Sequence, residues 1–190
     1  MNILVARSPE EIEFAYEKLA ASAVLGCDTE TSGLSTRYGK LFSVQFSDGD
    51  LSVLVPISER VSLGKLAGIL EDPNITKIFH NARFDLEFLR ENSYPVENIF
   101  CTMVAEKVLT RGADQSASLA ETLYRYFAVD LEKSHGKTFT KNWNGIWTDE
   151  LVNYALSDVL YLPRLMQEQK LWLERLGLAE EFATQMKKVN

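Results

Sequence analysis

A chain of 190 residues is long enough for one compact domain with a hydrophobic core and too short for two domains of ordinary size, so we expect residues 1–190 to form a single domain. Its residues are 46% hydrophobic and 25% charged, as in soluble globular proteins. The formal net charge of -7 argues against a protein that coats nucleic acid by bulk electrostatics. It does not exclude a nuclease, because carboxylates that hold divalent cations add to the same negative charge.

The sequence lacks the patterns of membrane and secreted proteins. No apolar run approaches the roughly 20 residues that span a bilayer, and acidic residues at Glu10, Glu11 and Glu13 are unlike a secretory signal. Cys27 and Cys101 are too few for a disulfide framework, and no Cys/His spacing suggests zinc. We therefore expect a cytoplasmic protein without a membrane partner.

The first elements are a short strand, a helix and a second strand. The apolar run at residues 3–5 predicts an edge strand. Ser8 is placed as a helix N-cap, with Pro9 at the first helical position and Glu11 closing a capping box. This helix is expected to run to about residue 21 and to be followed by a buried strand.

A β-hairpin and a second helix come next. Residues 41–46 alternate apolar and polar side chains, 47–50 form a turn and 51–55 are apolar again, which is the pattern of a hairpin. Residues 63–70 have helical spacing and stop before an Asp-Pro pair at 72–73.

The second half of the chain is mostly helical. A short strand at 76–79 leads into a helix on which Phe84, Phe88 and Leu89 share a face, and Asn81 is placed as its N-cap. Three further helical stretches are expected, and the last should restart at Pro163 and end at a Gly177 C-cap; these stretches cover residues 101–109, 118–127 and 148–176.

These elements favour one fold class. Strands in the first half, helices in the second and a strand–helix alternation near residue 79 predict an α/β fold with a mixed central sheet flanked by helices. Residues 131–147 are rich in Lys, Thr, Asn and Gly, and we expect a surface loop there, of a length that is often functional.

Two carboxylates stand where the second strand should end. Side chains i and i+2 of a strand point to the same face, so Asp28 and Glu30 should project together. They repel each other unless a cation lies between them, and Mg²⁺ prefers oxygen ligands. An isolated Asp-x-Glu is common, however, and a solvated strand end explains it equally well.

Helical spacing supplies further candidates. Tyr154 and Asp158 lie one turn apart on one helix face, and Asn81 and Asp85 have the same spacing. Four carboxylates and a tyrosine therefore stand at element ends.

Geometry excludes one similar pattern and disfavours another. Asp85 and Glu87 diverge by about 200° on a helix and cannot share a metal. Tyr126 and Asp130 repeat the Tyr-x-x-x-Asp spacing, but Asp130 follows the apolar run at the expected helix end.

The ordered set resembles a known superfamily. Asp28-Thr29-Glu30, residues 81–85 and residues 154–158 are similar to the three motifs of the DEDD 3′–5′ exonucleases. The tyrosine marks the subgroup that contains ribonuclease D and the proofreading domains of family A DNA polymerases. The resemblance covers about residues 22 to 170 and implies a ribonuclease H-like exonuclease fold.

The resemblance also implies the cofactors and the catalytic group. Two divalent ions, Mg²⁺ or Mn²⁺, are implied, with Asp28 shared between them and Asp85 acting through water. Tyr154 is implied as a catalytic residue; its ordinary pKa near 10 makes it a better water-orienting group than a base. The implied metal-binding and catalytic acids are Asp28, Glu30, Asp85 and Asp158.

Further positions are implied as contacts to the 3′ end of a single strand. Thr31 and Leu34 would meet the terminal nucleotide, with Leu34 wedged between the last two bases. Asn81 would contact a phosphate or serve only as an N-cap. The loop residues could hold the strand or simply be solvated or packed; these are Lys133, Lys137, Lys141, Trp143 and Trp147.

One departure from the family pattern concerns Cys101. Relatives usually carry an aspartate there, as a supporting group rather than a metal ligand. We expect Cys101 to be a small buried residue.

The resulting hypothesis is a metal-dependent 3′–5′ exonuclease that releases nucleoside 5′-monophosphates from single-stranded nucleic acid. DNA is the favoured substrate, although the sequence does not separate DNA proofreading from RNA trimming. Two arrangements stay open: a free-standing enzyme, or one that acts beside a polymerase domain in the same or another chain. The alternatives are an RNA-trimming enzyme like ribonuclease D, a catalytically silent nucleic-acid-binding domain on the same fold, and a small-molecule phosphohydrolase.

Overall fold

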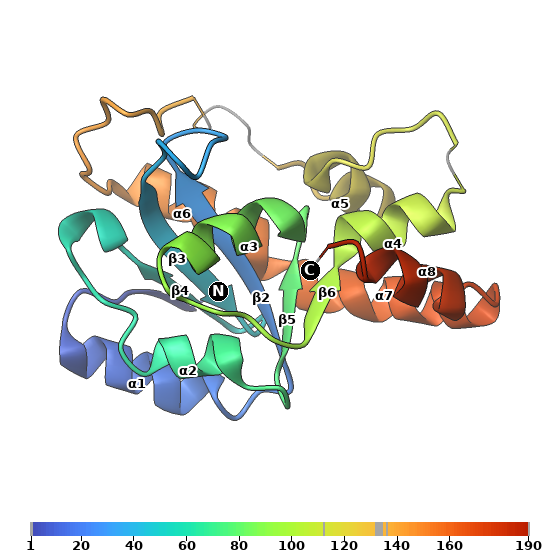
Figure 1. Ribbon diagram of the computed structural model, residues 1–190, viewed down its shortest axis with the longest axis horizontal. Helices are drawn as coiled ribbons and strands as arrows, with labels where there is room; N and C mark the ends of the chain where they lie inside the picture. Colours follow the sequence, from blue (N-terminus) through green and yellow to red (C-terminus); the bar gives the residue numbers. More distant parts are fainter. Residues whose placement is uncertain (1, 112, 132–134, 136, 190) are drawn as a thin grey trace.

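The fold is built on a six-stranded mixed sheet with the strand order β1-β4-β3-β2-β5-β6 (Figure 1). The computed structural model describes residues 2–111, 113–131, 135 and 137–189, and all statements below concern these residues. The strands are β1 (Asn2–Val5), β2 (Val24–Thr31), β3 (Leu41–Ser47), β4 (Leu51–Val55), β5 (Thr76–Phe79) and β6 (Ile99–Cys101).

Both strand directions occur in the sheet. The β2–β3 and β3–β4 pairs are antiparallel, as the predicted hairpin requires, whereas β1–β4, β2–β5 and β5–β6 are parallel. The predicted mixed sheet and the edge position of the first strand are therefore confirmed.

Helices cover both faces of the sheet. In Figure 1, α3 lies in front of the sheet and α6 behind it, while α1 and α2 lie at the end opposite the tip of β2. Buried side chains form one cluster on the side of α1, α2 and α3 and a second on the side of α6 and α7. The helices are α1 (Pro9–Leu19), η1 (Ile57–Glu59), α2 (Leu66–Glu71), α3 (Ala82–Glu91), α4 (Thr102–Leu109), α5 (Leu119–Phe127), α6 (Asp149–Leu160), α7 (Leu162–Arg175) and α8 (Ala179–Met186).

Local sequence signals explain several helix ends. The Ser8 hydroxyl accepts the Glu11 backbone N–H at 3.2 Å, and the Glu11 carboxylate accepts the Ser8 N–H at 3.0 Å, so the predicted capping box is present. Pro163 stands in the first turn of α7, directly after α6 ends, and Gly177 adopts a φ of +66° beyond α7.

Three details differ from the sequence-based expectations. α1 ends at Leu19 and α2 begins only at Leu66, so both helices are shorter than predicted. Strand β6 was not predicted, because a three-residue strand is too short to show a period. Asn81 occupies the N-cap position of α3 as predicted, but it lies in the left-handed region at φ 65° and its side chain makes no capping hydrogen bond.

Gly26 permits the close approach of β2 and α6. A Cβ at this position would lie 2.5 Å from the Val159 carbonyl oxygen and 3.1 Å from Leu162 Cβ. The first contact is with backbone and cannot be relieved by a side-chain rotation. Gly26 therefore allows the last turn of α6, which carries Asp158, to pack against the strand that carries Asp28.

We expect Gly26→Ala to lower the free energy of unfolding by about 1–3 kcal/mol, because the extra methyl group forces the strand and the helix apart. In thermal unfolding, this corresponds to a Tm about 2–10 °C lower than that of the native chain. Gly68→Ala is the matched control: it lies inside α2 with open space at its Cβ position, and it should raise Tm slightly. Equal Tm values for Gly26→Ala and the native chain would contradict the packing argument.

Candidate active site

The site is built where β2 leaves its neighbour β5. Pairing between these strands covers only Val24–Gly26, because β5 ends at Phe79 and the chain turns into α3. On its other side, β2 stays paired with β3 through Thr31, which keeps it rigid. Side chains from α3 and α6 can therefore reach the exposed edge of β2 beyond Gly26.

Three carboxylates meet at this edge. Asp28 and Glu30 project to the same face of β2, as predicted, and α6 brings Asp158 to them. One carboxylate oxygen from each of these three residues lies within 4.8 Å of the other two. Residues about 130 positions apart in the chain thus form one cluster.

Asp85 approaches the cluster from α3. Its Oδ1 accepts hydrogen bonds from the Thr29 backbone N–H at 3.1 Å and from the Thr29 hydroxyl at 2.7 Å. The Asp85 side chain is 2% exposed. It lies close enough to raise the pKa of Asp28 and Glu30 by charge repulsion, although it does not share the 4.8 Å cluster.

Burial raises the pKa of all four acids, and repulsion between neighbouring carboxylates adds to it for Asp28, Glu30 and Asp85. Desolvation is the largest cause for each and raises the pKa of Asp85 and of Asp158 to about 7. The pKa of Asp28 and that of Glu30 also lie well above their ordinary values, with the neighbouring carboxylates as the next cause. Such a cluster is costly unless protons or cations neutralise it.

Divalent cations fit this donor set. Several carboxylate oxygens converge without a neutralising lysine or arginine among the described ion pairs. Hard cations such as Mg²⁺ and Mn²⁺ take oxygen ligands of this kind.

The raised pKa values predict how stability depends on pH. The folded state binds protons on these acids more tightly than the unfolded chain does. Their contribution to the free energy of unfolding is therefore complete below about pH 4 and is lost as the pH rises through about 7. Buried His80 has the opposite effect on stability: its pKa is lowered to about 4, so it destabilises the folded state as the pH falls below the ordinary pKa of histidine.

Divalent cations stabilise the ionised carboxylates only. Thermal unfolding should therefore show a larger Mg²⁺-induced rise in Tm at about pH 8 than at about pH 6; an equal rise at both would contradict this electrostatic explanation.

Tyr154 lies one turn before Asp158 on α6. Its ring packs at 6.2 Å from Phe139 and at 5.9 Å from His135, measured between ring centroids. Burial, followed by the charges of Glu30, Asp158 and Asp28, raises its pKa above the ordinary value. The phenol therefore keeps its proton and can donate or accept a hydrogen bond at the carboxylate cluster.

The segment before α6 supports Tyr154 through an aromatic cluster. Trp143 lies 4.8 Å from Phe42 of β3 and 5.0 Å from both Phe139 and Trp147, in edge-to-face geometry. Trp147 is buried. Of the two roles open for the tryptophans, packing is the one that the structure shows.

Thr29 is a functional candidate that the sequence reasoning missed. It lies between Asp28 and Glu30 but points to the opposite face of β2, towards α3, where it orients Asp85. The alternation of side chains in a strand was the available signal.

We expect Thr29→Val to lower kcat about tenfold with little change in KM, because Asp85 keeps the backbone donor but loses the hydroxyl that also lowers its pKa. The acid limb of the pH–rate profile should move to higher pH. Thr29→Ser, which retains the hydroxyl, should restore both values. If the valine variant has the kcat and pH–rate profile of the native chain, Thr29 does not contribute to the function of the site.

The other predicted contact residues do not belong to the carboxylate cluster itself. The Thr31 hydroxyl donates to the Gly33 carbonyl at 3.1 Å, which fixes the start of the β2–β3 loop. Leu34 in this loop is 89% exposed, and Asn81 is exposed at the start of α3. Lys137 and Lys141 are exposed, whereas Lys133 lies outside the described residues.

The two sequence patterns that geometry argued against contribute no further carboxylate to the cluster. Glu87 is exposed and pairs with Arg83 at 3.2 Å instead of joining Asp85. Asp130 lies beyond the end of α5 and outside the carboxylate cluster. Cys101 is buried and accepts the Ala82 N–H at 3.5 Å, as expected for a packed residue.

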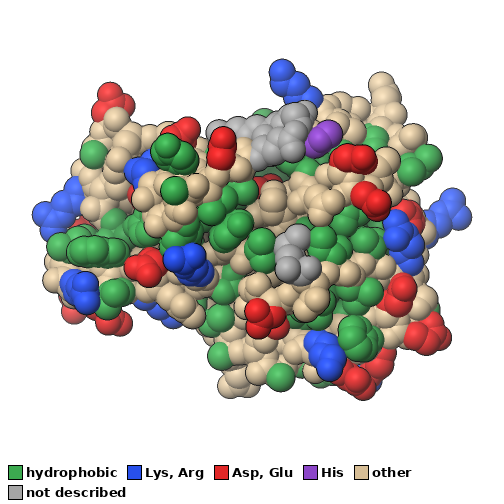
Figure 2. All heavy atoms as spheres, turned by 180° about the vertical axis from the view of Figure 1, so that it is seen from behind, with side chains coloured by type: hydrophobic (Ala, Val, Ile, Leu, Met, Phe, Trp, Pro, Cys, Tyr) green, Lys and Arg blue, Asp and Glu red, His purple; other side chains and the backbone are tan. Residues whose placement is uncertain are grey.

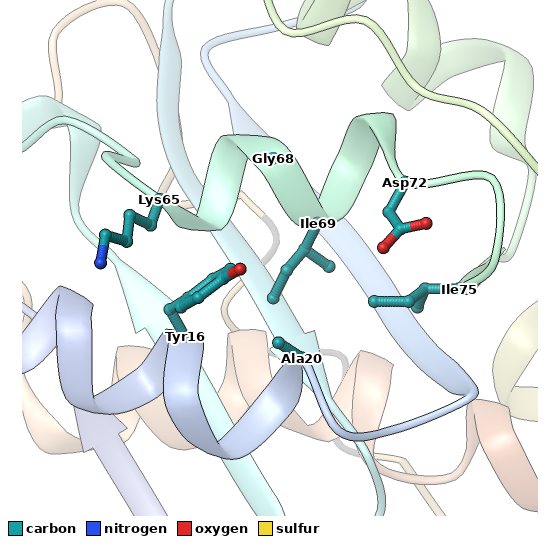
Figure 3. Close-up of a pocket in the computed structure, with 7 residues that line it drawn as sticks. All are labelled: Tyr16, Ala20, Lys65, Gly68, Ile69, Asp72 and Ile75. Carbon is teal, nitrogen blue, oxygen red and sulfur yellow. The ribbon is translucent and has the colours of Figure 1, made fainter.

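Other surface features do not compete with this site. A pocket of about 290 Å³ lies between α1 and α2 (Figure 3), but its lysine, Lys65, is already paired with Glu13 at 2.6 Å. Figure 2 shows the face seen from behind with both charge signs scattered among hydrophobic side chains. None of the helices in the described part of the chain is both long and apolar enough to cross a bilayer.

Comparisons with known proteins agree with the geometry. Residues 5–174 match the family described as 3'-5' exonuclease. Ribonuclease D of Jannaschia sp. is 32% identical over 165 residues, which are 83% of this chain and 42% of that protein. The chain thus spans less than half the length of this curated relative.

Solved structures show the same fold. NrnC of Brucella melitensis superposes with a TM-score of 0.81 at 28% identity, covering 99% of this chain and 89% of that one. Related NrnC structures are described with bound Mg²⁺ and bound to pGG. Escherichia coli RNase D, at 23% identity, shares the fold with a TM-score of 0.85 over 100% of this chain and 50% of that one. The predicted ribonuclease H-like exonuclease fold is therefore confirmed, and the chain belongs to the 3′–5′ exonuclease family.

Proposed function

We propose that this chain is a divalent-cation-dependent exonuclease that removes nucleoside 5′-monophosphates one at a time from the 3′ end of single-stranded RNA. The observation that carries the proposal is the cluster of Asp28, Glu30 and Asp158, with Asp85 and Tyr154 beside it, in a chain of the 3′–5′ exonuclease family. A silent binding domain would not need to preserve so costly a set of buried acids.

RNA is preferred over DNA in this proposal because the curated relatives are named ribonuclease D. The DNA preference and the proofreading role expected from the sequence find no support among them, and a polymerase partner is not part of the proposal. The assignment to residues 1–190 of a single domain and the cytoplasmic location remain predictions.

A second candidate substrate is a very short oligonucleotide. This chain aligns with 88% of an NrnC structure that is described as bound to pGG, at 29% identity. Dinucleotides therefore belong in the first substrate panel.

The proposed division of labour follows the geometry. Asp28, Glu30, Asp85 and Asp158 would hold two divalent ions. Such ions, when bound, acidify water and stabilise charge on a phosphoryl group. Tyr154 keeps its proton and orients the attacking water by a hydrogen bond.

The remaining contacts would position the strand. Leu34 offers an exposed apolar side chain to the last two bases, and Thr31 shapes the loop that carries it. Asn81, freed from capping α3, is available to a phosphate oxygen. None of these contacts reads a base edge, so cleavage should not depend on sequence.

The test uses RNA and DNA strands of the same sequence, labelled at the 5′ end, with Mg²⁺ or Mn²⁺ and with EDTA. The proposal predicts a ladder that shortens from the 3′ end, faster for RNA, released 5′-monophosphates, and no cleavage in EDTA. Faster shortening of DNA would overturn the RNA assignment. Binding of strands without cleavage under any metal condition would favour the silent domain.

A further inference from the structure

Tyr38, in the loop between β2 and β3, has two cations close to its ring. Tyr38 is 63% exposed, so the fold does not use its ring as core. The Arg37 guanidinium lies 5.4 Å and the Lys141 ammonium 5.5 Å from the centre of this ring. Among the described residues, neither cation takes part in an ion pair.

The loop that carries Tyr38 is tied to the end of β2. The Ser32 N–H donates to the Lys40 carbonyl at 3.0 Å, and the Lys40 N–H donates to the Ser32 hydroxyl at 2.8 Å. Gly39 packs so closely that an added Cβ would lie 2.8 Å from the Phe88 ring. The base of the loop is thereby fixed next to Glu30.

Lys141 comes from a different part of the chain, between α5 and α6. It stands in the segment that leads to α6, two residues before Trp143, whose ring packs on Phe42. In Figure 1, this segment and the β2–β3 loop lie together above the tip of β2. Glu30 is two residues from Ser32, and Tyr38 is two residues from Lys40, to which Ser32 is hydrogen-bonded. The Cα–Cα distance between Glu30 and Tyr38 is therefore about 20 Å at most, which a few nucleotides span.

The chemistry of this group suits a nucleic-acid strand. An exposed aromatic ring can stack on a base of any identity, and flanking cations neutralise backbone phosphates. The overall charge of -7 would otherwise repel a polyanion, so local cations close to the site matter more than they would in a basic protein.

We propose that Tyr38, Arg37 and Lys141 form an upstream platform that binds the strand on the 5′ side of the nucleotides at the carboxylate cluster. Tyr38 stacks on a base, and the two cations contact the phosphates beside it. This inference rests on the proposed function, since it takes the carboxylate cluster as the place of the 3′ end. The platform should give strands of several nucleotides a higher binding affinity than dinucleotides, because dinucleotides are too short to reach it.

The test compares Tyr38→Ala and Lys141→Gln with the native chain on a single-stranded RNA heptamer and an RNA dinucleotide. Binding of a labelled heptamer is measured by fluorescence anisotropy, with Ca²⁺ supplied in place of Mg²⁺, and KM is measured with Mg²⁺. Tyr38→Ala should weaken heptamer binding about tenfold and leave the dinucleotide KM unchanged. Lys141→Gln should reduce the slope of log affinity against log salt by about 0.7, the value for one phosphate contact to a single strand.

A matched control exists on α1. Lys18 lies 5.5 Å from the ring of the exposed Phe14, the same kind of cation–aromatic pair at the opposite end of the sheet (Figure 1). Phe14→Ala and Lys18→Gln should leave heptamer binding and its salt slope unchanged. The platform is refuted if Tyr38→Ala leaves heptamer binding unaltered, or if it impairs heptamer and dinucleotide equally. Because anisotropy does not require cleavage, an inactive native chain would refute the proposed function, while heptamer binding would still decide the platform.

Discussion

Asp28→Asn is expected to reduce the rate of 3′-end shortening about a thousandfold or more while making the protein more stable without divalent cations. The rate falls because Asp28 belongs to the carboxylate cluster that is proposed to hold the divalent ions, and several kcal/mol of transition-state stabilisation would depend on those ions. The stability rises because the variant removes a carboxylate whose pKa is raised by burial and by the repulsion of its neighbours. Single-turnover cleavage of labelled RNA and thermal unfolding in EDTA measure the two effects.

The matched control is Asp130→Asn, in the sequence pattern that repeats the Tyr-x-x-x-Asp spacing outside the cluster. It should leave both the cleavage rate and Tm close to those of the native chain. If Asp28→Asn simply impaired folding, Tm and the cleavage rate would fall together. The loss of a metal-binding carboxylate should instead lower the rate while Tm in EDTA rises. Undiminished cleavage by Asp28→Asn would place the chemistry elsewhere.

Tyr154→Phe is expected to lower kcat about 10- to 100-fold and to leave KM and Tm nearly unchanged. The phenylalanine ring keeps the packing on Phe139 but lacks the hydroxyl that is proposed to orient the water. Because the pKa of Tyr154 is raised, the phenol does not ionise at neutral pH, and the variant should show a pH–rate profile parallel to that of the native chain.

Tyr126→Phe is the control for this substitution. Tyr126 is also partly buried beside an acid, Glu106, and its pKa is likewise raised, but it lies on α5, away from the cluster. This variant should retain the native kcat. If Tyr154→Phe instead removed an inflection from the pH–rate profile, the tyrosine would be a base rather than an orienting group.

The sequence predicted the parts of the site that follow from local periodicity. The i, i+2 spacing placed Asp28 and Glu30 on one face of β2, and the i, i+4 spacing placed Tyr154 above Asp158 on α6. Both spacings are properties of a single element and need no knowledge of the fold.

The parts that were missed depend on how elements pack. The hydrogen bonds from Thr29 to Asp85 exist only because β2 separates from β5 at its end. The close approach at Gly26 depends on where α6 crosses the sheet. The backbone of Asn81 is left-handed because the chain turns sharply from β5 into α3, and this placed its side chain outside the cap geometry. Alternation along β2 indicates which face Thr29 occupies but not that Asp85 lies there, and spacing within one element carries no signal for the other two features.

The most direct test counts bound Mn²⁺ by electron paramagnetic resonance in the native chain and in four single variants that neutralise Asp28, Glu30, Asp85 and Asp158. The account predicts two Mn²⁺ ions in the native chain in the presence of a nucleoside 5′-monophosphate and fewer in each variant. Glu87→Gln, whose carboxylate is paired on the surface, should bind as many as the native chain. Full Mn²⁺ binding by all four variants, with RNA still shortened from its 3′ end, would contradict the assignment of these acids to the active site.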